Sequence, residues 1–131
     1  MFSVKDRVKQ ETATTGDAHV IFSSSLDGYQ DFSSLGHGTQ TFYAIEESTN
    51  WEVGIGNVIT APFQGITRDT IIDSASGAGN KIYLSGAATI FVTYPASGAV
   101  FTTGDNTALI TGIRLGASGI SFNDGSLQTT A

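Results

Sequence analysis

Glycine and proline break this chain into short pieces, and their spacing constrains the fold more than any other feature. Sixteen glycines and two prolines occur, the first of them Gly16. Only Met1–Thr15 and Thr39–Val53 run for 15 residues without either. A mean α-helix needs about 11–12 residues, whereas a strand of about 5–6 residues fits between most of these breaks. The spacing therefore predicts strands over most of the chain.

Side chains within these pieces alternate between apolar and polar, as in a strand that buries one face. Trp51, Val53 and Ile55 share one face of such a strand, and turn-forming dipeptides such as Asp27-Gly28 separate the pieces. The pattern predicts an all-β fold, either an antiparallel β-sandwich or a barrel. The core expected from the alternation comprises Phe22, Phe42, Trp51, Val53, Ile55, Ile72, Ile82, Leu84, Ile90, Val92 and Tyr94.

The composition changes after Pro95, which suggests two parts. We expect a β-sandwich domain over residues 1–97 and a short glycine-rich β-segment over residues 98–131. The second part is too small and too poor in aromatic residues to close a core of its own. Either it completes the sheet of the first domain, or identical segments from several chains pack together, for example as a threefold bundle. In the second case the oligomer contacts are Ile110, Ile113, Leu115, Ile120 and Phe122.

Charge and composition exclude several classes of protein. The 131 residues carry a net charge of −6 and no cysteine. The acidic balance argues against a nucleic-acid partner, and the missing thiols exclude disulfides, thiolate zinc sites and thiol nucleophiles. No run approaches the roughly 18 apolar residues of a membrane helix, so no membrane partner is expected.

No residue pattern points to catalysis, to a cofactor or to a metal. His37 lies between two glycines, and such a turn does not hold a side chain in the fixed position that a general base needs. His19 alternates with apolar neighbours, as a residue on the surface of a sheet would. Glu46 and Glu47 would point to opposite faces of a strand, and Asp69 and Asp73 are typical of a solvated face. Asp105-Asn106 and Asn123-Asp124-Gly125 lack the spacing of a calcium loop and are better explained as turns. We therefore expect no catalytic, cofactor-binding or metal-binding residues.

Two weaker binding hypotheses remain. Tyr29, Phe32 and Tyr43 would be the sugar platforms if the chain were a carbohydrate-binding module. The N-terminal residues favour an extended arm or first strand, with one or two helical turns as the alternative. This arm would dock on an acidic surface of a partner through Lys5, Arg7, Val8 and Lys9.

Several phrases, taken together and in order, resemble a recurrent domain of tailed bacteriophages. The phrases are Val4–Thr12, Thr49–Gly56, Arg68–Ile72 and Phe91–Ala96. The domain occurs near the N-terminus of tail fibres and other virion proteins, notably in phages of aquatic bacteria. Separately, Ile120–Ala131 resembles a short phrase found in phage fibre shafts and near fibre tips.

The resemblance implies a non-enzymatic structural protein located in the virion, homotrimeric and attached through its N-terminal region. Its partners would be other virion proteins of the tail, baseplate, portal-adaptor region or capsid, with a host-surface glycan as a further candidate. Fibres with this domain continue into a shaft and a receptor-binding tip, whereas this chain stops at Ala131. We therefore expect a tail fibre or fibre adaptor, with a capsid decoration protein as the alternative.

Overall fold

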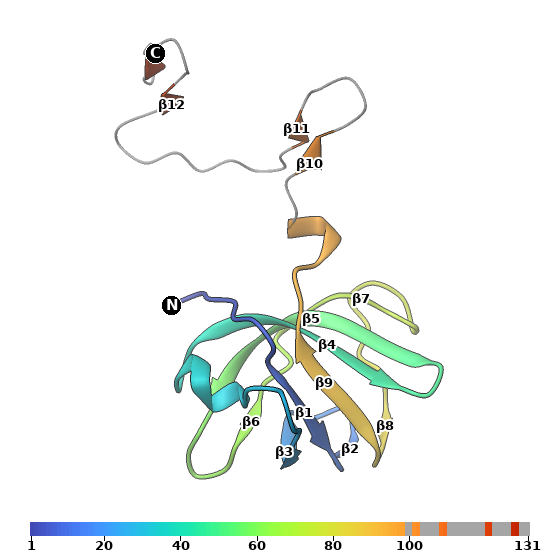
Figure 1. The fold of residues 1–131 in the computed structure, drawn as a ribbon. Helices are drawn as coiled ribbons and strands as arrows, with labels where there is room; N and C mark the ends of the chain where they lie inside the picture. The colour runs from blue at the N-terminus through green and yellow to red at the C-terminus, as the bar shows by residue number, and fades with distance from the viewer. Residues whose placement is uncertain (99–100, 103–107, 110–119, 122–126, 129–131) are drawn as a thin grey trace. The chain divides into compact units, whose positions relative to one another are not determined.

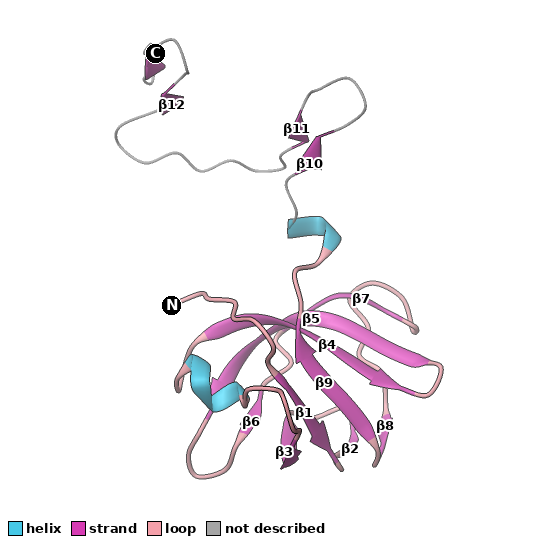
Figure 2. Ribbon diagram, viewed as in Figure 1, coloured by secondary structure: helices cyan, strands magenta, loops and turns pink. Residues whose placement is uncertain are grey.

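The structure is a computed structural model that describes residues 1–98, 101–102, 108–109, 120–121 and 127–128. The chain forms two compact units, Met1–Ala96 and Ser97–Ala131, and each is described by itself. The strands of the first unit are β1 (Lys9–Thr12), β2 (Thr15–Gly16), β3 (Val20–Ser25), β4 (Gln40–Glu47), β5 (Asn50–Ile59), β6 (Gly65–Ile66), β7 (Thr70–Ser74), β8 (Leu84–Ser85) and β9 (Ala88–Val92) (Figure 1). Two short 3-10 helices, η1 (Phe32–Leu35) and η2 (Ala96–Gly98), are the helical elements of the described residues (Figure 2).

Six antiparallel strands of the first unit close into a barrel. Their order is β4-β9-β1-β3-β6-β5, and the pairing of β5 with β4 closes the ring. Of the two expected architectures, the structure shows the barrel. The closure pairs each of these six strands on both sides, and β7 pairs with β5 as an additional strand.

β5 closes the barrel because it is long enough to serve three partners. Its first eight residues pair with β4, from Asn50 opposite Glu47 to Asn57 opposite Gln40. Its other side pairs first with β7, between Glu52 and Ile55, and then with β6, at Val58 and Ile59. β2 and β8 form a separate two-stranded ladder.

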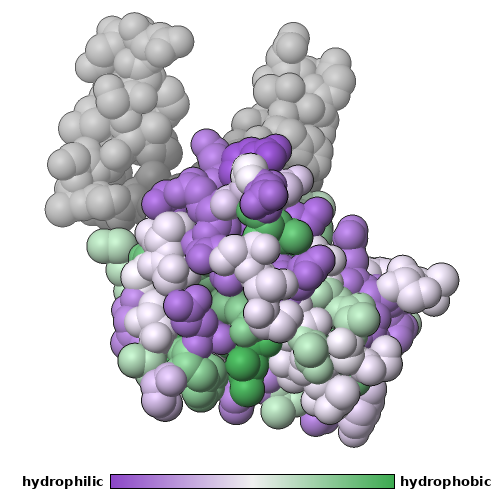
Figure 3. All heavy atoms as spheres, turned by 60° about the horizontal axis from the view of Figure 1, so that its bottom comes forward, coloured by the Kyte–Doolittle hydropathy of each residue, from purple (hydrophilic) through white to green (hydrophobic). Residues whose placement is uncertain are grey.

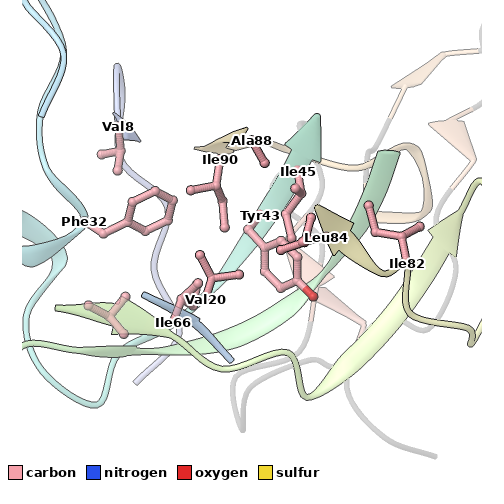
Figure 4. Close-up of a cluster of buried hydrophobic side chains, with 11 residues drawn as sticks. Val8, Val20, Phe32, Tyr43, Ile45, Ile66, Ile82, Leu84, Ala88 and Ile90 are labelled. Carbon is pink, nitrogen blue, oxygen red and sulfur yellow. The ribbon is translucent and has the colours of Figure 1, made fainter. Parts of the chain in front are cut away.

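The interior of the barrel is filled by apolar side chains from many elements. Figure 4 shows this cluster, with Val8 and Phe32 at one end and Ile82 at the other. The buried set is Val8, Val20, Phe32, Tyr43, Ile45, Val58, Ile66, Ile82, Leu84, Ala88 and Ile90. The surface is mixed: on the face that Figure 3 brings forward, hydrophobic residues lie in small groups among hydrophilic ones.

The inward face of β5 is the opposite of the one expected from its apolar residues. Glu52, Gly54 and Gly56 are buried, whereas Trp51 is 40% exposed and Val53 is half-buried. The inward face is narrow. A Cβ atom on Gly54 would lie 2.6 Å from the Tyr43 hydroxyl oxygen, and one on Gly56 would collide with the backbone of Thr67. Trp51, Val53 and Ile55 therefore point outward, and Val58, near the end of β5, is the apolar side chain of this strand that enters the core.

The expected core is therefore correct only in part. Ile82, Leu84 and Ile90 are buried as expected, and Phe22 and Val92 pack against the core while partly exposed. Trp51 and Tyr94 are wrong, with Tyr94 59% exposed beyond the end of β9. The remaining expected core residues, Phe42, Val53, Ile55 and Ile72, are half-buried.

The N-terminal residues form no helix and lie along the barrel in an irregular, extended path. Ser3 N donates to Gln40 O at 2.9 Å, and Gln40 N donates to Met1 O at 2.8 Å. Further on, Lys9 N donates to Gln30 O, and β1 begins at Lys9. The segment is thus an extended lead into the first strand, as preferred over the helical alternative.

The second unit contains two small antiparallel ladders among its described residues. β10 (Phe101–Thr102) pairs with β11 (Ala108–Leu109), and β12 (Ile120–Ser121) pairs with β13 (Leu127–Gln128). Of the expected oligomer contacts, Ile120 lies in β12, whereas Ile110, Ile113, Leu115 and Phe122 lie outside the described residues. Trimerisation through this segment stays a prediction. Neither helix of the described residues has the length and apolar character needed to cross a bilayer.

Candidate functional site

A charged cluster lies inside the barrel, centred on Glu52 of β5. Glu52 is fully buried, and its Oε1 accepts hydrogen bonds from the Tyr43 hydroxyl at 2.7 Å and from Arg68 Nε at 2.8 Å. Its Oε2 accepts one from Ile82 N at 2.9 Å and forms an ion pair with Arg68 Nη2. Four donors therefore satisfy this carboxylate, as a buried charge requires.

Arg68 extends the cluster to two further segments of backbone. Its Nη2 donates to Ile82 O at 2.7 Å, and its Nη1 donates to Ala18 O at 3.3 Å. The planar guanidinium thus joins the loop before β3, the β6–β7 connection and the segment before β8 to β5. Arg68 thus has a structural role, because its hydrogen bonds hold these segments together.

The pKa shifts in the cluster reflect this arrangement. Burial, reinforced by the negative charge of Glu52, raises the pKa of the Tyr43 hydroxyl far above its ordinary value. Burial alone would lower the pKa of Arg68, but the hydrogen bonds and charge of Glu52 outweigh it and raise that pKa. Tyr43 stays protonated and Arg68 stays charged at physiological pH, so neither is poised to exchange a proton.

A second carboxylate, Glu47 at the end of β4, holds the turn between β8 and β9. Ser85 donates to it from its backbone N at 2.9 Å and from its hydroxyl at 2.8 Å, and Ala87 N donates at 3.4 Å. Burial would raise the pKa of Glu47, but the bonds from Ser85 and the nearby backbone N–H groups outweigh it and lower that pKa. Glu47 is thus kept ionised as an anchor for this turn.

The basic N-terminal segment borders two hollows against the end of β9. One, of about 500 Å³, is lined by Val4, Lys5, Asp6, Arg7, Val92, Thr93 and Tyr94. The other, of about 290 Å³, shares Arg7 and Val92 and is lined also by Val8, Lys9, Tyr29, Glu46 and Phe91. These volumes approach or fall within the roughly 300–1,000 Å³ range of ligand sites.

The residues predicted to dock on a partner lie in different environments. Val8 is buried in the core, whereas Lys5 and Arg7 are exposed and Lys9 is half-buried. Arg7 donates to Gly28 O from Nε at 3.2 Å and Nη2 at 3.0 Å, with its guanidinium carbon 4.2 Å from the centre of the Tyr29 ring. The structure therefore brings the three basic residues to one surface and places Val8 beneath it.

An apolar surface covers the outside of the β4–β5 ladder. At one end, the ring of Phe42 lies 4.7 Å from that of Phe2 and 6.0 Å from that of Tyr94. Phe42 is paired with Ile55 in register, and Trp51 projects on the same outward face of β5 toward the hairpin turn. We call this the outer apolar face.

The two histidines and Asp69, all weighed for catalysis, make ordinary structural contacts. His37 is exposed, and its Nδ1 accepts a hydrogen bond from Thr60 N at 3.0 Å, while the His19 ring stacks on Phe63. Asp69 accepts from the Asn57 side chain at 2.7 Å. In the part of the chain that is described, no three His, Asp or Glu side chains gather as metal ligands would. The two turns weighed for calcium, at 105–106 and 123–125, lie outside it.

Of the three expected sugar platforms, only Tyr29 reaches the surface. Phe32 and Tyr43 are both fully buried, so they cannot stack on a sugar. The Tyr29 ring is 37% exposed and is approached by both Arg7 and Lys9.

Sequence reasoning missed the Glu52–Arg68 pair and the part that Tyr94 and Phe91 play beside the basic segment. A signal for the first was present: Glu52, Gly54 and Gly56 alternate as one face, and such a small-residue face suits a crowded barrel interior. No local signal marks the second, because it depends on the end of β9 meeting the N-terminal segment.

Comparison of the chain with protein-family models, with curated proteins and with solved structures gave no match.

Proposed function

We propose that this chain is a structural protein of a tailed-phage virion, a tail fibre or fibre adaptor that attaches through its N-terminal region and trimerises. The function is binding, and the barrel is the rigid support for it. The proposal starts from the resemblance of the phrases between Val4 and Ala96 to the recurrent phage domain.

The observation that carries the proposal is the outer apolar face. Three large apolar side chains, those of Trp51, Phe2 and Tyr94, are 40%, 44% and 59% exposed. Large exposed apolar groups on one face are a common mark of protein–protein contact. A subunit that is held among neighbours would cover this face in the assembled particle.

The barrel interior supports the same function in another way. Every buried side-chain nitrogen or oxygen of the described residues has a hydrogen-bond partner within the chain. Buried polar groups that are all hydrogen-bonded stabilise the barrel as a rigid support. Contacts with a partner protein would then be made by its outer surface.

Immunogold electron microscopy of purified virions tests the location. An antibody against residues 1–97 should label the tail or the neck of the particle. Labelling spread over the whole capsid would favour the decoration protein, and particles without label would contradict both.

A glycan partner is tested separately with a glycan array. The full chain should leave the array unlabelled, since Phe32 and Tyr43 are buried. Saturable glycan binding that Tyr29→Ala abolishes would favour the carbohydrate-binding module.

A further inference from the structure

Half of the lysines and arginines of this acidic chain gather in its first nine residues, at the two hollows beside β9. Lys5, Arg7 and Lys9 are three of six such residues in a chain with a net charge of −6. They line the hollows from one side, while the end of β9 lines them from the other.

The three cations have no carboxylate partner in the described part of the chain. The ion pair found there joins Arg68 to Glu52, inside the barrel. Lys5 Nζ and Arg7 instead donate to backbone oxygens, those of Ser34 and Gly28. The hollows also contain Asp6 and Glu46, so the local balance is three positive charges against two negative ones.

Lys9 and Arg7 converge on one aromatic ring. Lys9 Nζ lies 5.2 Å from the centre of the Tyr29 ring, on which Arg7 also lies, and 5.9 Å from that of Phe91. Cations near the faces of rings are attracted to them and remain available to an anion. An anion that lies between two neighbouring positive charges also lowers their mutual electrostatic repulsion.

Several backbone N–H groups of the same segment make no hydrogen bond within the described part of the chain. The N–H groups of Val4, Lys5 and Asp6 donate to no other described residue. Free N–H groups beside cationic side chains suit a ligand rich in acceptors, as an extended acidic peptide is.

We propose that these two hollows, with Lys5, Arg7 and Lys9 on one side and Phe91 to Tyr94 on the other, bind an extended acidic peptide segment of a neighbouring protein. Charge complementarity selects the peptide, and the rings of Tyr29 and Tyr94 cover its apolar parts. The identity of the neighbour as a virion protein rests on the proposed function. The binding itself does not, because it is measured on the isolated chain.

Fluorescence anisotropy with a fluorescein-labelled decaglutamate peptide tests the proposal on the full chain at low salt. Binding should saturate and weaken as salt is added, and a labelled decalysine peptide should not bind. No saturable binding of decaglutamate would overturn the proposal, while leaving the location in the virion to its own test.

Lys9→Gln and Lys81→Gln form a matched pair, because each removes one positive charge and Lys81 is exposed away from the hollows. Lys9→Gln should weaken binding by about threefold and Lys5→Gln with Lys9→Gln by about tenfold, as expected for surface charge pairs. Lys81→Gln should change it by less than about 1.5-fold if only the local charge matters. An equal loss in Lys9→Gln and Lys81→Gln would mean nonspecific attraction and would overturn the proposal.

Two further measurements on the unmodified chain guard against variants that fail to fold. Amide chemical shifts on adding decaglutamate should change most at residues 4–9 and 91–94, and changes centred elsewhere would contradict the site. A galacturonic acid decamer should compete less well than decaglutamate. Stronger competition by this saccharide would show that the hollows select an anionic glycan, and would overturn the peptide assignment.

Discussion

Glu52 is a carboxylate in the interior of a barrel whose other inward side chains are mostly apolar. It is stabilised because four donors surround it, the strongest of them the guanidinium of Arg68. A buried ion pair stabilises a folded chain little more than an apolar pair of the same size would. Removing one partner is costly, however, because it leaves an unpaired charge in the interior. We infer that the pair determines which segments of the chain lie against β5.

Arg68→Met is therefore expected to lower the free energy of unfolding by about 3–5 kcal/mol, because it leaves Glu52 buried without its cation. Urea denaturation followed by circular dichroism measures this. In a double-mutant cycle, Glu52→Met with Arg68→Met should cost less than the sum of the two single changes. Additive single changes would contradict the pairing, and Lys81→Met serves as the exposed control.

Glu47 links stability to pH. Its pKa is lowered in the folded chain, so it contributes stability that is fully present above the unfolded pKa of about 4.3 and is lost as pH falls through the folded value. The free energy of unfolding of the chain should exceed that of Glu47→Gln at pH 7, and the difference should shrink below about pH 4. Denaturation of both proteins across pH 3–7 measures it. A difference that stays constant down to pH 3 would show that the Glu47 charge is not involved.

Among the elements, β5 shows what alternation can and cannot predict. The period of two correctly predicted a strand over Trp51–Ile55, and the glycine spacing correctly predicted an all-β fold. The direction of the faces was wrong, because alternation gives two sets of side chains without saying which lies inside. The narrow interior beside Tyr43 and Thr67 decides which set lies inside, and this crowding exists only once β5 has paired with β4, β6 and β7.

Gly54→Ala tests the direction of the β5 faces. The added methyl group would meet Thr70 O at 2.5 Å and the Tyr43 hydroxyl, so we expect a loss of about 1–3 kcal/mol in the free energy of unfolding. Val53→Ala, on the outward face, should cost less than about 1.5 kcal/mol because Val53 is only half-buried. If Val53→Ala is the more damaging of the two in urea denaturation, the faces are reversed.

The turn between β4 and β5 carries local strain at one position. Ser48 has φ of 55°, a left-handed conformation that glycine adopts without cost, whereas Thr49 does not have a positive φ. Ser48→Gly should raise the midpoint of thermal unfolding. The free energy of unfolding should rise by at most about 0.5 kcal/mol, because glycine also gives the unfolded chain more conformational freedom. Thr49→Gly is the matched control and should lower the midpoint. A decrease with both would mean that the turn is unstrained.

At the scale of the whole molecule, the part of the site that could be predicted was the basic character of the N-terminal segment. Lys5, Arg7 and Lys9 lie within five residues of the sequence, so their proximity can be expected without knowing the fold. The second side of the hollows could not be predicted, since Phe91 and Tyr94 reach it only through the pairing of β9 with β1 and β4. The Glu52–Arg68 pair likewise joins residues 16 positions apart, because β5 pairs with both β6 and β7.

The proposed trimer makes a prediction for the chain in solution. The full chain should sediment at three times the 13.6 kDa of one chain, and a fragment of residues 1–97 should stay folded and sediment as a monomer. Sedimentation equilibrium with a parallel thermal melt measures both. A monomeric full chain at micromolar concentration would count against self-assembly of the free protein, and a trimeric fragment would place the contacts in the barrel.

We propose that this chain works as part of a phage particle. Quantitative mass spectrometry of purified virions, with the major capsid protein as the internal standard, tests it most directly. We expect between a handful and a few dozen copies per particle, in a multiple of three. Hundreds of copies would assign the chain to the capsid surface, and its absence from washed, infectious particles would contradict the account.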